Sequence, residues 1–335
     1  MGEMLEKQGV KELTDRLHGQ MINARNQTEF YQKNAEVLIE ALPWIKHSTG
    51  KTVVIKYGGA AMVDKQLRSD VMSDIVLMKL IGLSPLIIHG GGNEITALCQ
   101  KLGLPVEFRN GMRVSPPEVM EIVKMVLLGK INQELVAEMN AHGHLAVGLS
   151  GADGHIMTVQ PLSAEMGMVG EVTQIDTTLL NDLIGRDYIP VVASIGVGED
   201  GLAYNINADI VAGELAAAIG AHKVIFLTDV DGLYADFSDK DTLISRLMLD
   251  EAQEVLASGE LSKGMIPKIE ACVKALEAGV PRAHILNGTI PHSLLLEIFT
   301  DEGVGTMIAQ NGEDVSEQFK ASPLKNLALK LNNSV

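Results

Sequence analysis

The chain has 335 residues, of which 46% are hydrophobic, 21% charged and 4% aromatic, and its formal net charge is -16. Such a composition is typical of a globular protein with an aliphatic core, and the length leaves room for two domains or lobes. The negative charge argues against nucleic-acid binding, since a polyphosphate backbone would be repelled, but a locally positive pocket would still accept a small anionic substrate.

The two cysteines, Cys99 and Cys272, lie in different apolar helical patterns and form neither a disulfide framework nor a zinc-binding spacing. We interpret both as core residues of a protein from a reducing compartment, and we predict no dedicated metal site. No apolar run reaches the roughly 18 residues that a membrane span needs, and the acid-rich N-terminus lacks the apolar core of a signal peptide. These features predict a cytoplasmic protein that does not bind membranes.

The first predicted elements are helical. Residues 1–28 carry a marginal helical pattern, to which we assign no function, whereas one apolar stripe along residues 29–45 predicts a stronger helix. Pro43 lies inside that stripe, so the helix should kink or restart there. A helix of this kind ahead of the first strand must bury its stripe against its own domain or against another subunit.

From Thr52 onwards, apolar runs that fit strands alternate with helical patterns. The predicted strands are Thr52–Lys56, Pro85–His89, Ile189–Ile195, Lys223–Thr228, Arg282–Leu286 and Thr306–Ala309, together with several short strands between Leu145 and Thr173 and a hairpin over Val106–Val114. The predicted helices are Asp64–Leu80, Asn93–Leu102, Pro116–Asn140, Asp176–Ile184, Ala208–Ile219, Asp250–Ala257, Met265–Ala278 and Ser293–Phe299. The alternation predicts a mostly parallel sheet with helices on both faces, and ligands at the carboxyl ends of its strands. The polar tail after Gln310 should be mobile.

Glycine clusters stand at two of these strand ends. In Lys56–Gly59, a lysine closes a buried strand and needs an anionic partner, and the glycines leave backbone N–H groups free to face a phosphate. The alternative is a solvated lysine at a strand edge. In His89–Asn93, three consecutive glycines open a helix whose N-terminus would face an anion, although a plain turn also uses glycines. The run His47–Thr52 ends like a Walker A loop, but Ile45 occupies its required glycine position and a strand follows, so we reject it.

Four further segments carry polar side chains, and the first three of them allow two interpretations each. Arg113 follows the predicted hairpin and suits a carboxylate, or is a surface residue. Asp209 lies in the first turn of its helix as a ligand-facing residue or as a cap. The run Thr228–Leu233 after a buried strand suits a nucleotide, or a turn. In Gly264–Lys268, a lysine stands at the positive end of a helix, which is unfavourable without an anion nearby.

In this order and spacing, these segments resemble the amino-acid kinase family over roughly residues 30–310. Single motifs are shared with carbamate kinase, uridylate kinase and aspartokinase. The Gly-Met-Arg-Val run around Arg113 and the Asn205–Asp209 run resemble the branch that acts on N-acetyl-L-glutamate. The resemblance implies a three-layer α/β/α sandwich with an open, mostly parallel sheet and two lobes. Residues 47–222 would bind acetylglutamate and mediate dimerisation, and residues 223–310 would bind the nucleotide, between a regulatory helical extension (1–46) and a polar tail (311–335).

The resemblance also implies roles for single residues. The γ-phosphoryl group of ATP would pass to the γ-carboxylate of the substrate, a step of arginine biosynthesis, with Mg²⁺ carried by the nucleotide and no general base. Lys56 and Lys268 would neutralise charge on the transferring group, and Asp209 would orient both lysines. The implied substrate-binding residues are Gly91, Gly92, Arg113, Asn205 and Asn207. The implied nucleotide-binding residues are Gly58, Gly59, Thr228, Asp229, Gly232, Leu233 and Met265.

Two features resemble the arginine-inhibited subgroup of that branch: the helix over Glu29–Ile45 and the segment His292–Thr306. In that subgroup such helices interlace three dimers into a ring, so the resemblance implies a homohexamer with L-arginine as an allosteric inhibitor. The candidate arginine-site residues are Trp44, Glu297, Gly303 and Gly305. A PII signalling protein as a further partner is left open.

Alternatives stay open at this point. Related kinases act on acetylaminoadipate, carbamate or glutamate, and substrate length is hard to read from a sequence. A catalytically inactive arginine sensor is a non-enzymatic alternative, against which the retention of Lys56, Lys268 and Asp209 argues. One departure from the family pattern is Lys263, where a glycine is usual, and it puts the nucleotide contacts of that segment in doubt.

Overall fold

The computed structural model describes residues 31–32, 35–36, 38–39, 41–62, 64–109, 111–236, 239–259, 261, 264–299 and 303–312. Contacts divide the chain into two units, Met1–His47 with Ser316–Val335, and Ser48–Val315. The predictions for residues 1–28, for the polar tail and for Lys263 lie outside the described residues. No helix in the described part of the chain has the length and apolarity to cross a membrane.

In the first unit, the described residues between 31 and 47 are helical. The helix continues through Pro43 and does not restart there, because proline removes one helical hydrogen bond but keeps a helical φ angle. Leu38 and Leu42 of the predicted apolar stripe are exposed, as are Tyr31 and Ile39 beside it, so these apolar side chains are not covered within one chain.

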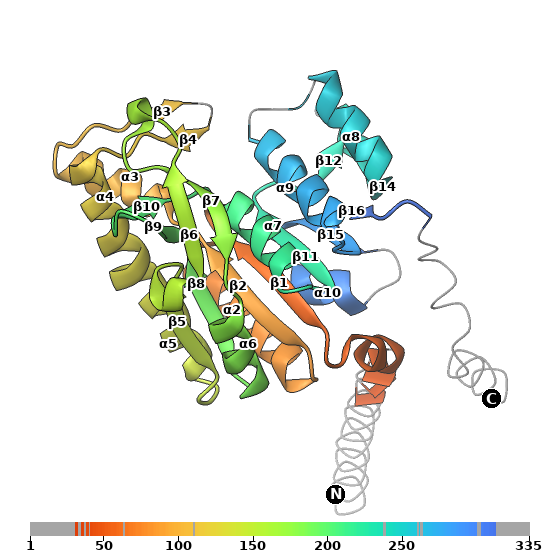
Figure 1. Cartoon of the computed structure of the whole chain (residues 1–335). Coiled ribbons are helices and arrows are strands. Elements are labelled where there is room, and N and C mark those ends of the chain that lie inside the picture. The colour runs from red at the N-terminus through yellow and green to blue at the C-terminus, as the bar shows by residue number, and fades with distance from the viewer. Residues whose placement is uncertain are drawn as a thin grey trace, which may run out of the picture. The chain divides into compact units, whose positions relative to one another are not determined.

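One eight-stranded sheet forms the centre of the second unit (Figure 1). From edge to edge its strands are β14 (Arg246–Met248), β16 (Thr306–Ala309), β15 (Arg282–Asn287), β11 (Lys223–Thr228), β1 (Thr52–Tyr57), β2 (Ser84–His89), β8 (Ile189–Ala193) and β5 (Ala146–Ser150). The six strands from β15 to β5 are parallel, whereas β16 pairs antiparallel with β15 and β14 runs with β16. The prediction of a mostly parallel sheet is confirmed.

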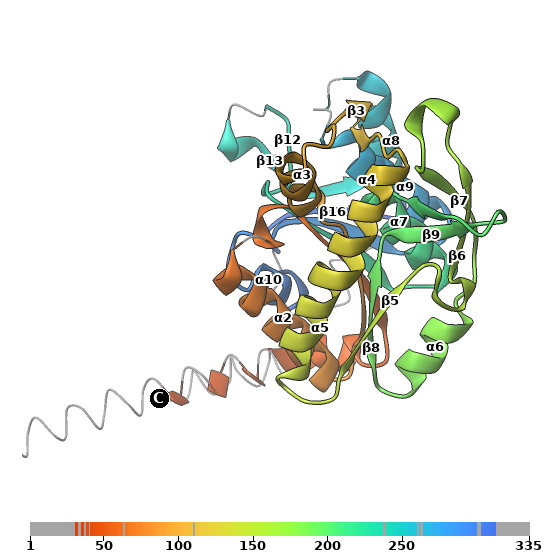
Figure 2. The same ribbon diagram turned by 90° about the vertical axis from the view of Figure 1, so that its left-hand side faces the viewer.

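Helices cover both faces of this sheet (Figure 2). On one face, β1 residues Val53, Ile55 and Tyr57 share a core with α2 (Lys65–Leu80), α3 (Gly92–Lys101), α4 (Pro117–Lys124), α5 (Gln133–Asn140) and α10 (Ser293–Phe299). On the other, Val54 joins α6 (Thr178–Gly185), α7 (Ala208–Ala218), α8 (Leu249–Ser258) and α9 (Ile266–Glu277). Alternate residues of one strand thus serve two cores, as the period of a strand requires. The three-layer α/β/α fold is confirmed, and Cys99 and Cys272 lie one in each core as free thiols.

Three smaller sheets complete the unit. A four-stranded sheet contains β10 (Ala203–Asn205), β9 (Ile195–Gly198), β6 (Met157–Pro161) and β7 (Gly170–Ile175). The predicted hairpin is confirmed as β3 (Phe108–Arg109) paired with β4 (Met112–Arg113), and β12 (Leu233–Tyr234) pairs with β13 (Leu243–Ile244). The β10 strand ends at Asn205, immediately before the N-terminus of α7, so this sheet leads directly to the strand-end region of the central sheet.

The helix predicted over Pro116–Asn140 differs from the structure in its middle. Between α4 and α5, the segment Met125–Asn132 is a π-helix. A π-helix has wider turns than an α-helix and therefore changes which side chains face the sheet. Apolar periodicity does not distinguish the two forms, because Val126, Leu127 and Ile131 are buried in either.

Candidate active site

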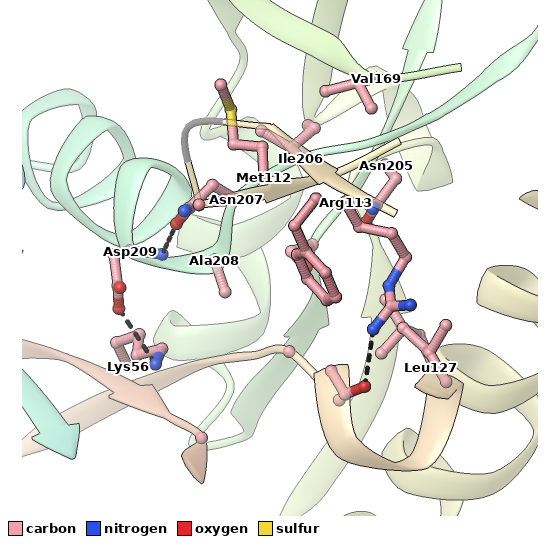
Figure 3. Close-up of a pocket in the computed structure, with 18 of the residues that line it drawn as sticks. Lys56, Met112, Arg113, Leu127, Val169, Asn205, Ile206, Asn207, Ala208 and Asp209 are labelled. Atoms are coloured by element: carbon pink, nitrogen blue, oxygen red, sulfur yellow. Dashed lines mark hydrogen bonds and ion pairs between the residues drawn. The ribbon is translucent and has the colours of Figure 1, made fainter. Parts of the chain in front are cut away.

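A pocket of about 220 Å³ opens beside the carboxyl ends of β1 and β2 (Figure 3). It gathers residues from sequence segments that lie far apart. The predicted residues among its lining are Lys56, Gly58, Gly59, Gly91, Gly92, Arg113, Asn205, Asn207 and Asp209. In Figure 3, Lys56 and Asp209 lie on one side of the pocket, and Arg113 and Leu127 lie on the other. The pocket thus has two polar ends, one with Lys56 and Asp209 and the other with Arg113.

The first end is an ion bridge. Asp209 Oδ1 lies 3.0 Å from Lys56 Nζ, and its Oδ2 lies 3.0 Å from Lys268 Nζ. Asp209 is 5% exposed and Lys56 is 9% exposed, so the alternative of a solvated lysine at a strand edge is wrong for Lys56. Burial alone would raise the pKa of Asp209, but the two ammonium groups outweigh it and hold that pKa below its ordinary value. The bridge therefore carries one negative and two positive charges.

Local structure positions each member of this bridge. Lys56 stands near the end of the buried strand β1, and Asp209 stands in the first turn of α7, which Asn207 caps by accepting from Asp209 N at 2.8 Å. Lys268 lies in the first turn of α9. A cation there opposes the helix dipole, and the Asp209 carboxylate offsets this cost. The expected approach of Asp209 to both lysines is present.

The second end centres on Arg113. Its Nη2 donates to Gly92 O at 2.8 Å and to Thr96 Oγ1 at 2.6 Å, and its guanidinium lies 4.7 Å from the centre of the Phe108 ring. Arg113 is 6% exposed, and its Nη1 has no hydrogen-bond partner within the described part of the chain. Burial lowers the pKa of Arg113, yet a guanidinium stays charged. A buried cation with an unused donor that lines a pocket suits an anionic ligand, and the surface alternative is wrong.

Backbone N–H groups lie between the two ends. The carbonyl oxygens of Gly91 and Gly92 accept from Ile95 N at 3.0 Å and from Thr96 Oγ1 at 2.8 Å. No hydrogen bond within the described residues occupies the N–H groups of Gly91 and Gly92. These groups open α3, where the helix dipole also favours an anion.

Two asparagines complete the lining. Asn205 donates from Nδ2 to Ser115 Oγ at 3.4 Å, and its backbone N–H bonds Met168 O, which fixes the end of β10. The Oδ1 atom of Asn207 caps α7, so only its Nδ2 group is left for a ligand. The predicted substrate contacts of both residues stay predictions.

The predicted nucleotide residues divide into two groups. Gly58 and Gly59 line the pocket, and a Cβ on Gly59 would lie 3.9 Å from Asp229 N, so the strand ends of β1 and β11 are adjacent. The others lie outside this pocket: Thr228, Asp229, Gly232, Leu233 and Met265. Leu233 and Met265 are buried in a core, so a nucleotide would meet them mainly through the backbone of their segments.

Three of the four candidate arginine-site residues lie around the end of α10, and Trp44 belongs to the first unit. Glu297 Oε1 lies 2.6 Å from His284 Nδ1, and its Oε2 accepts from Val304 N at 2.8 Å. A Cβ on Gly303 would lie 2.7 Å from Glu297 Oε2, and one on Gly305 would lie 2.2 Å from Ile285 O. Close packing against backbone therefore requires glycine at position 305, whereas the positive φ angle of Gly303 favours glycine there.

Sequence reasoning missed several residues of the pocket region, among them the apolar lining residues Ile95 and Val169. Phe108 and Ser194 line the pocket, Thr96 holds Arg113, and Leu127 contacts the glycine loop from the π-helix. One signal was available for Thr96, because a hydroxyl four residues after Gly92 in a helix lies one turn above it. Phe108 precedes the hairpin turn that carries Arg113, but nothing in its sequence context indicates that the ring stacks on the guanidinium.

Comparisons with known proteins agree with this geometry. Residues 51–287 match the model of the amino acid kinase family. An acetylglutamate kinase of Caldanaerobacter subterraneus subsp. tengcongensis is 51% identical over 278 residues, which cover 82% of this chain and 93% of the relative. An acetylglutamate kinase of Nostoc punctiforme is 51% identical over 273 residues, which cover 81% and 92%.

Two solved structures of one synthase, with different bound ligands, are also similar to this chain. The first is the N-acetylglutamate synthase of Neisseria gonorrhoeae in complex with coenzyme A and N-acetyl-glutamate, with a TM-score of 0.74, 25% identity and 83% of this chain covered. The complex of that synthase with coenzyme A and L-arginine gives a TM-score of 0.69 at 25% identity, with 81% of this chain covered. In both comparisons the chain spans 64% of the synthase chain.

Proposed function

The chain belongs to the amino acid kinase family, and we propose that it transfers the γ-phosphoryl group of ATP to the γ-carboxylate of N-acetyl-L-glutamate, a step of arginine biosynthesis. The bridge Lys56–Asp209–Lys268 at one end of the pocket carries this proposal. Two lysines that share one buried carboxylate leave a net positive charge where a phosphoryl group would be transferred. The relatives at 51% identity that are acetylglutamate kinases support the choice of acceptor.

The two lysines act on the transition state. Phosphoryl transfer spreads negative charge over the oxygens of the moving group, and fixed cations that face these oxygens stabilise it. Lys56 approaches from the end of β1 and Lys268 from the start of α9, with Asp209 holding both ammonium groups at 3.0 Å. The acceptor carboxylate is already ionised at neutral pH, so no side chain has to remove a proton from it.

The acceptor would lie between Arg113 and the ion bridge. The unused Nη1 of Arg113 would bind the α-carboxylate, since its Nη2 is already fixed by Gly92 O and Thr96. The N–H groups of Gly91 and Gly92 would hold the reacting end, and Asn205 and Asn207 would meet the acetamide and its surroundings. This orientation points the γ-carboxylate toward Lys56.

ATP would lie along the ends of β1 and β11. Gly58 and Gly59 would bring bare backbone to its phosphates, and Thr228–Leu233 with the segment before Met265 would surround the rest of the nucleotide. The two lysines and these glycines fit a polyphosphate. Mg²⁺ would arrive with the nucleotide and neutralise phosphate charge. In this arrangement residues 47–222 form the acceptor lobe and residues 223–310 the nucleotide lobe.

Inhibition by L-arginine is the regulatory part of the proposal. Glu297 is a buried carboxylate at the end of α10 that is bonded by His284 and by Val304 N. A guanidinium would replace or join these two donors. Arginine in complex with a similar synthase supports this ligand. The exposed apolar residues of the first unit support assembly into a hexamer of three dimers through the N-terminal helices. Trp44 of that unit stays a predicted arginine contact. We place the enzyme in the cytoplasm, because both cysteines are free.

The assay that tests this function couples ADP release to a signal and compares acceptors of graded length. N-acetyl-L-glutamate should be the best acceptor, with N-acetyl-L-aspartate, N-acetyl-aminoadipate, glutamate and carbamate well below it. A higher kcat/KM for any of these acceptors would replace the substrate in the proposal. Absence of ATP turnover with all of them would favour a binding protein.

A further inference from the structure

The carbonyl groups of His89, Gly90 and Gly91 are all hydrogen-bonded within the protein. His89 O accepts from Ser194 N at 3.2 Å, Gly90 O lies 3.1 Å from His89 Nδ1, and Gly91 O accepts from Ile95 N at 3.0 Å. In a planar trans peptide, the N–H of each residue points opposite to the carbonyl before it. The N–H groups of Gly91 and Gly92 therefore point away from these donors, toward the pocket that both residues line.

The Gly90–Gly91 peptide differs from its neighbours in how it is held. The carbonyl of Gly91 bonds within helix α3, and that of His89 bonds the backbone of Ser194, whereas the carbonyl of Gly90 bonds a side chain. Glycine on both sides of a peptide lowers the barrier to its rotation, because no Cβ restricts the dihedral angles. Without the contact to His89, this peptide is the one that would flip and turn its carbonyl toward an anionic ligand.

A second residue determines which nitrogen of His89 carries the proton. Asn132 Nδ2 lies 3.0 Å from His89 Nε2, 2.9 Å from Val191 O and 3.4 Å from Leu149 O. Two backbone carbonyls around this atom require it to be the amide nitrogen, a donor. The neutral imidazole then accepts at Nε2 and must carry its proton on Nδ1, which donates to Gly90 O. Asn132 is 2% exposed and His89 is fully buried, so water does not compete for these contacts.

The π-helix Met125–Asn132 brings this asparagine to the loop. The π-helix also packs against the glycine loop His89–Asn93, since a Cβ on Gly91 would lie 2.2 Å from Ile131 Cδ1 and 2.8 Å from Leu127 Cδ2. On the far side, a Cβ on Gly148 would lie 2.0 Å from Asn132 Oδ1, so only a glycine at this position leaves room for the Asn132 amide. Burial lowers the pKa of His89 to about 4, which keeps the ring neutral at physiological pH.

We propose that His89 and Asn132 are positioning residues, which together hold the Gly90–Gly91 peptide with the Gly91 N–H directed at the reacting carboxylate and the phosphoryl group transferred to it. The inference rests on the function proposed above. His89 touches neither reactant and acts only through the backbone of Gly90 and Gly91. A preorganised N–H donor of this kind contributes to the rate because it is already aligned when charge develops.

Two substitutions of His89 separate the hydrogen bond from the packing. His89→Leu keeps much of the volume and removes the donor, so kcat with N-acetyl-L-glutamate should fall about 100-fold, the usual effect of losing one such donor, with little change in the KM for ATP. His89→Asn can place an amide N–H where Nδ1 was, and should stay within about 5-fold of the wild type. The control is Asn140→Ala at the end of the following helix, which breaks exposed or partly buried hydrogen bonds to Leu145 and Ala146 away from the loop. It should lower the melting temperature and leave kcat unchanged.

The tautomer itself can be observed in the wild-type protein. Side-chain ¹⁵N spectra of histidine-labelled protein should contain a buried ring that is protonated at Nδ1 and unprotonated at Nε2 between pH 5.5 and 8, although the other tautomer is the commoner form in water. His284 is also buried and bonds Glu297 through Nδ1, so the signal of His89 is identified by its absence from His89→Asn. An Nε2-protonated His89, or equal losses of kcat in His89→Leu and His89→Asn, would overturn the proposal. A wild-type protein that does not phosphorylate N-acetyl-L-glutamate would refute the proposed function instead. The tautomer of His89 would still test whether its ring holds the Gly90–Gly91 peptide.

Discussion

Asp209 and Glu297 are both buried carboxylates with pKa values below the ordinary range, but their partners differ. Burial raises the pKa of each, and at Asp209 two lysine ammonium groups at 3.0 Å overcome it. At Glu297 hydrogen bonds from His284 and from Val304 N do so, with Lys223 as a more distant charge. Burial lowers the pKa of His284, which we take to be neutral.

This difference indicates different tasks. A carboxylate between two permanent cations stays ionised across the physiological range, and its lysines remain aligned on the pocket. Glu297 is held by hydrogen bonds and not by two fixed cations at 3.0 Å, so a guanidinium that replaced these donors would form a direct ion pair with it. We therefore expect substitutions in the first region to change turnover and substitutions in the second to change regulation.

The largest expected effect is on turnover, at the ion bridge. Lys268→Ala removes one cation that faces the transferred phosphoryl group, so kcat should fall by ~10²–10³ with a modest change in KM for both substrates. Lys274→Ala in the same helix is the matched control, since Lys274 is largely exposed and pairs with Glu214 on α7. Steady-state kinetics of both variants decide the point: normal turnover in Lys268→Ala would remove this lysine from the mechanism.

The second effect is on acceptor binding. Arg113→Lys keeps the charge but loses the planar fork, so it cannot bond Gly92 O, Thr96 and a ligand carboxylate at once. We expect the KM for N-acetyl-L-glutamate to rise about 10- to 50-fold with little change in the KM for ATP. Arg109→Lys in the same hairpin is the control, because Arg109 is exposed and pairs with Glu107 and Glu165. Equal rises of both KM values in Arg113→Lys would contradict the assignment.

The fold could be predicted almost completely from the sequence because its signals are local. The apolar runs that stop at glycines predict strand ends at Lys56 and His89; β1 ends one residue later, at Tyr57, and β2 ends at His89. The ends of β11 and β16 lie at the predicted residues. The antiparallel direction of β16 was not predicted, since a short apolar run has the same pattern in either direction. The resemblance named residues, but the pairing of Asp209 with both lysines depends on how three separate segments pack.

The polar network beneath the glycine loop was not predicted for a different reason. Asn132 stands in a helix whose buried face is otherwise apolar, which is an available signal that a buried polar group needs a partner. The partner of Asn132, His89, is 43 residues away in the sequence, and Asn132 itself lies in a π-helix. The apolar periodicity of the sequence indicates neither property. Contacts between buried polar groups of distant segments become visible only in three dimensions.

The third effect concerns inhibition. Glu297→Gln removes the charge that a guanidinium would bind, so the L-arginine concentration for half inhibition should rise at least about 10-fold, within the usual range of allosteric coupling. The kcat without arginine should change by less than about 2-fold, because Glu297 does not line the active-site pocket. Glu277→Gln, an exposed change in α9, should leave inhibition as it was. Unchanged inhibition in Glu297→Gln would move the arginine site elsewhere.

The fourth prediction separates assembly from catalysis. Because Ser48–Val315 is a compact unit of its own, a chain without residues 1–45 should fold, sediment as a dimer and phosphorylate N-acetyl-L-glutamate at a similar rate. The full-length chain should sediment as a hexamer with sigmoidal inhibition by L-arginine, which the shortened chain should largely lose. A full-length dimer that ignores millimolar arginine would refute the regulatory proposal and leave the kinase function untouched.

The smallest expected effect is on stability at mildly acidic pH, and it tests the neutral state of His89. Its native pKa is about 4, whereas an unfolded histidine titrates near ~6.5. As pH falls below the unfolded value, the unfolded chain binds a proton that the native chain refuses, so the free energy of unfolding decreases. From pH 7.5 to 5.5 this loss is about 1.4 kcal/mol for one such histidine, and His284 adds a loss of the same sign.

His89→Asn should therefore lose less stability over that interval than the wild type, by about the contribution of one histidine. The measurement is reversible denaturant unfolding at equal protomer concentration, since association also changes apparent stability. Asn140→Ala should keep the wild-type dependence on pH, because it retains the buried imidazole while lowering stability at every pH. If His89→Asn and the wild type lost the same free energy between pH 7.5 and 5.5, the native ring would take up its proton as readily as an unfolded histidine. The neutral ring that accepts from Asn132 at Nε2 and donates to Gly90 O from Nδ1 would then not be the native form.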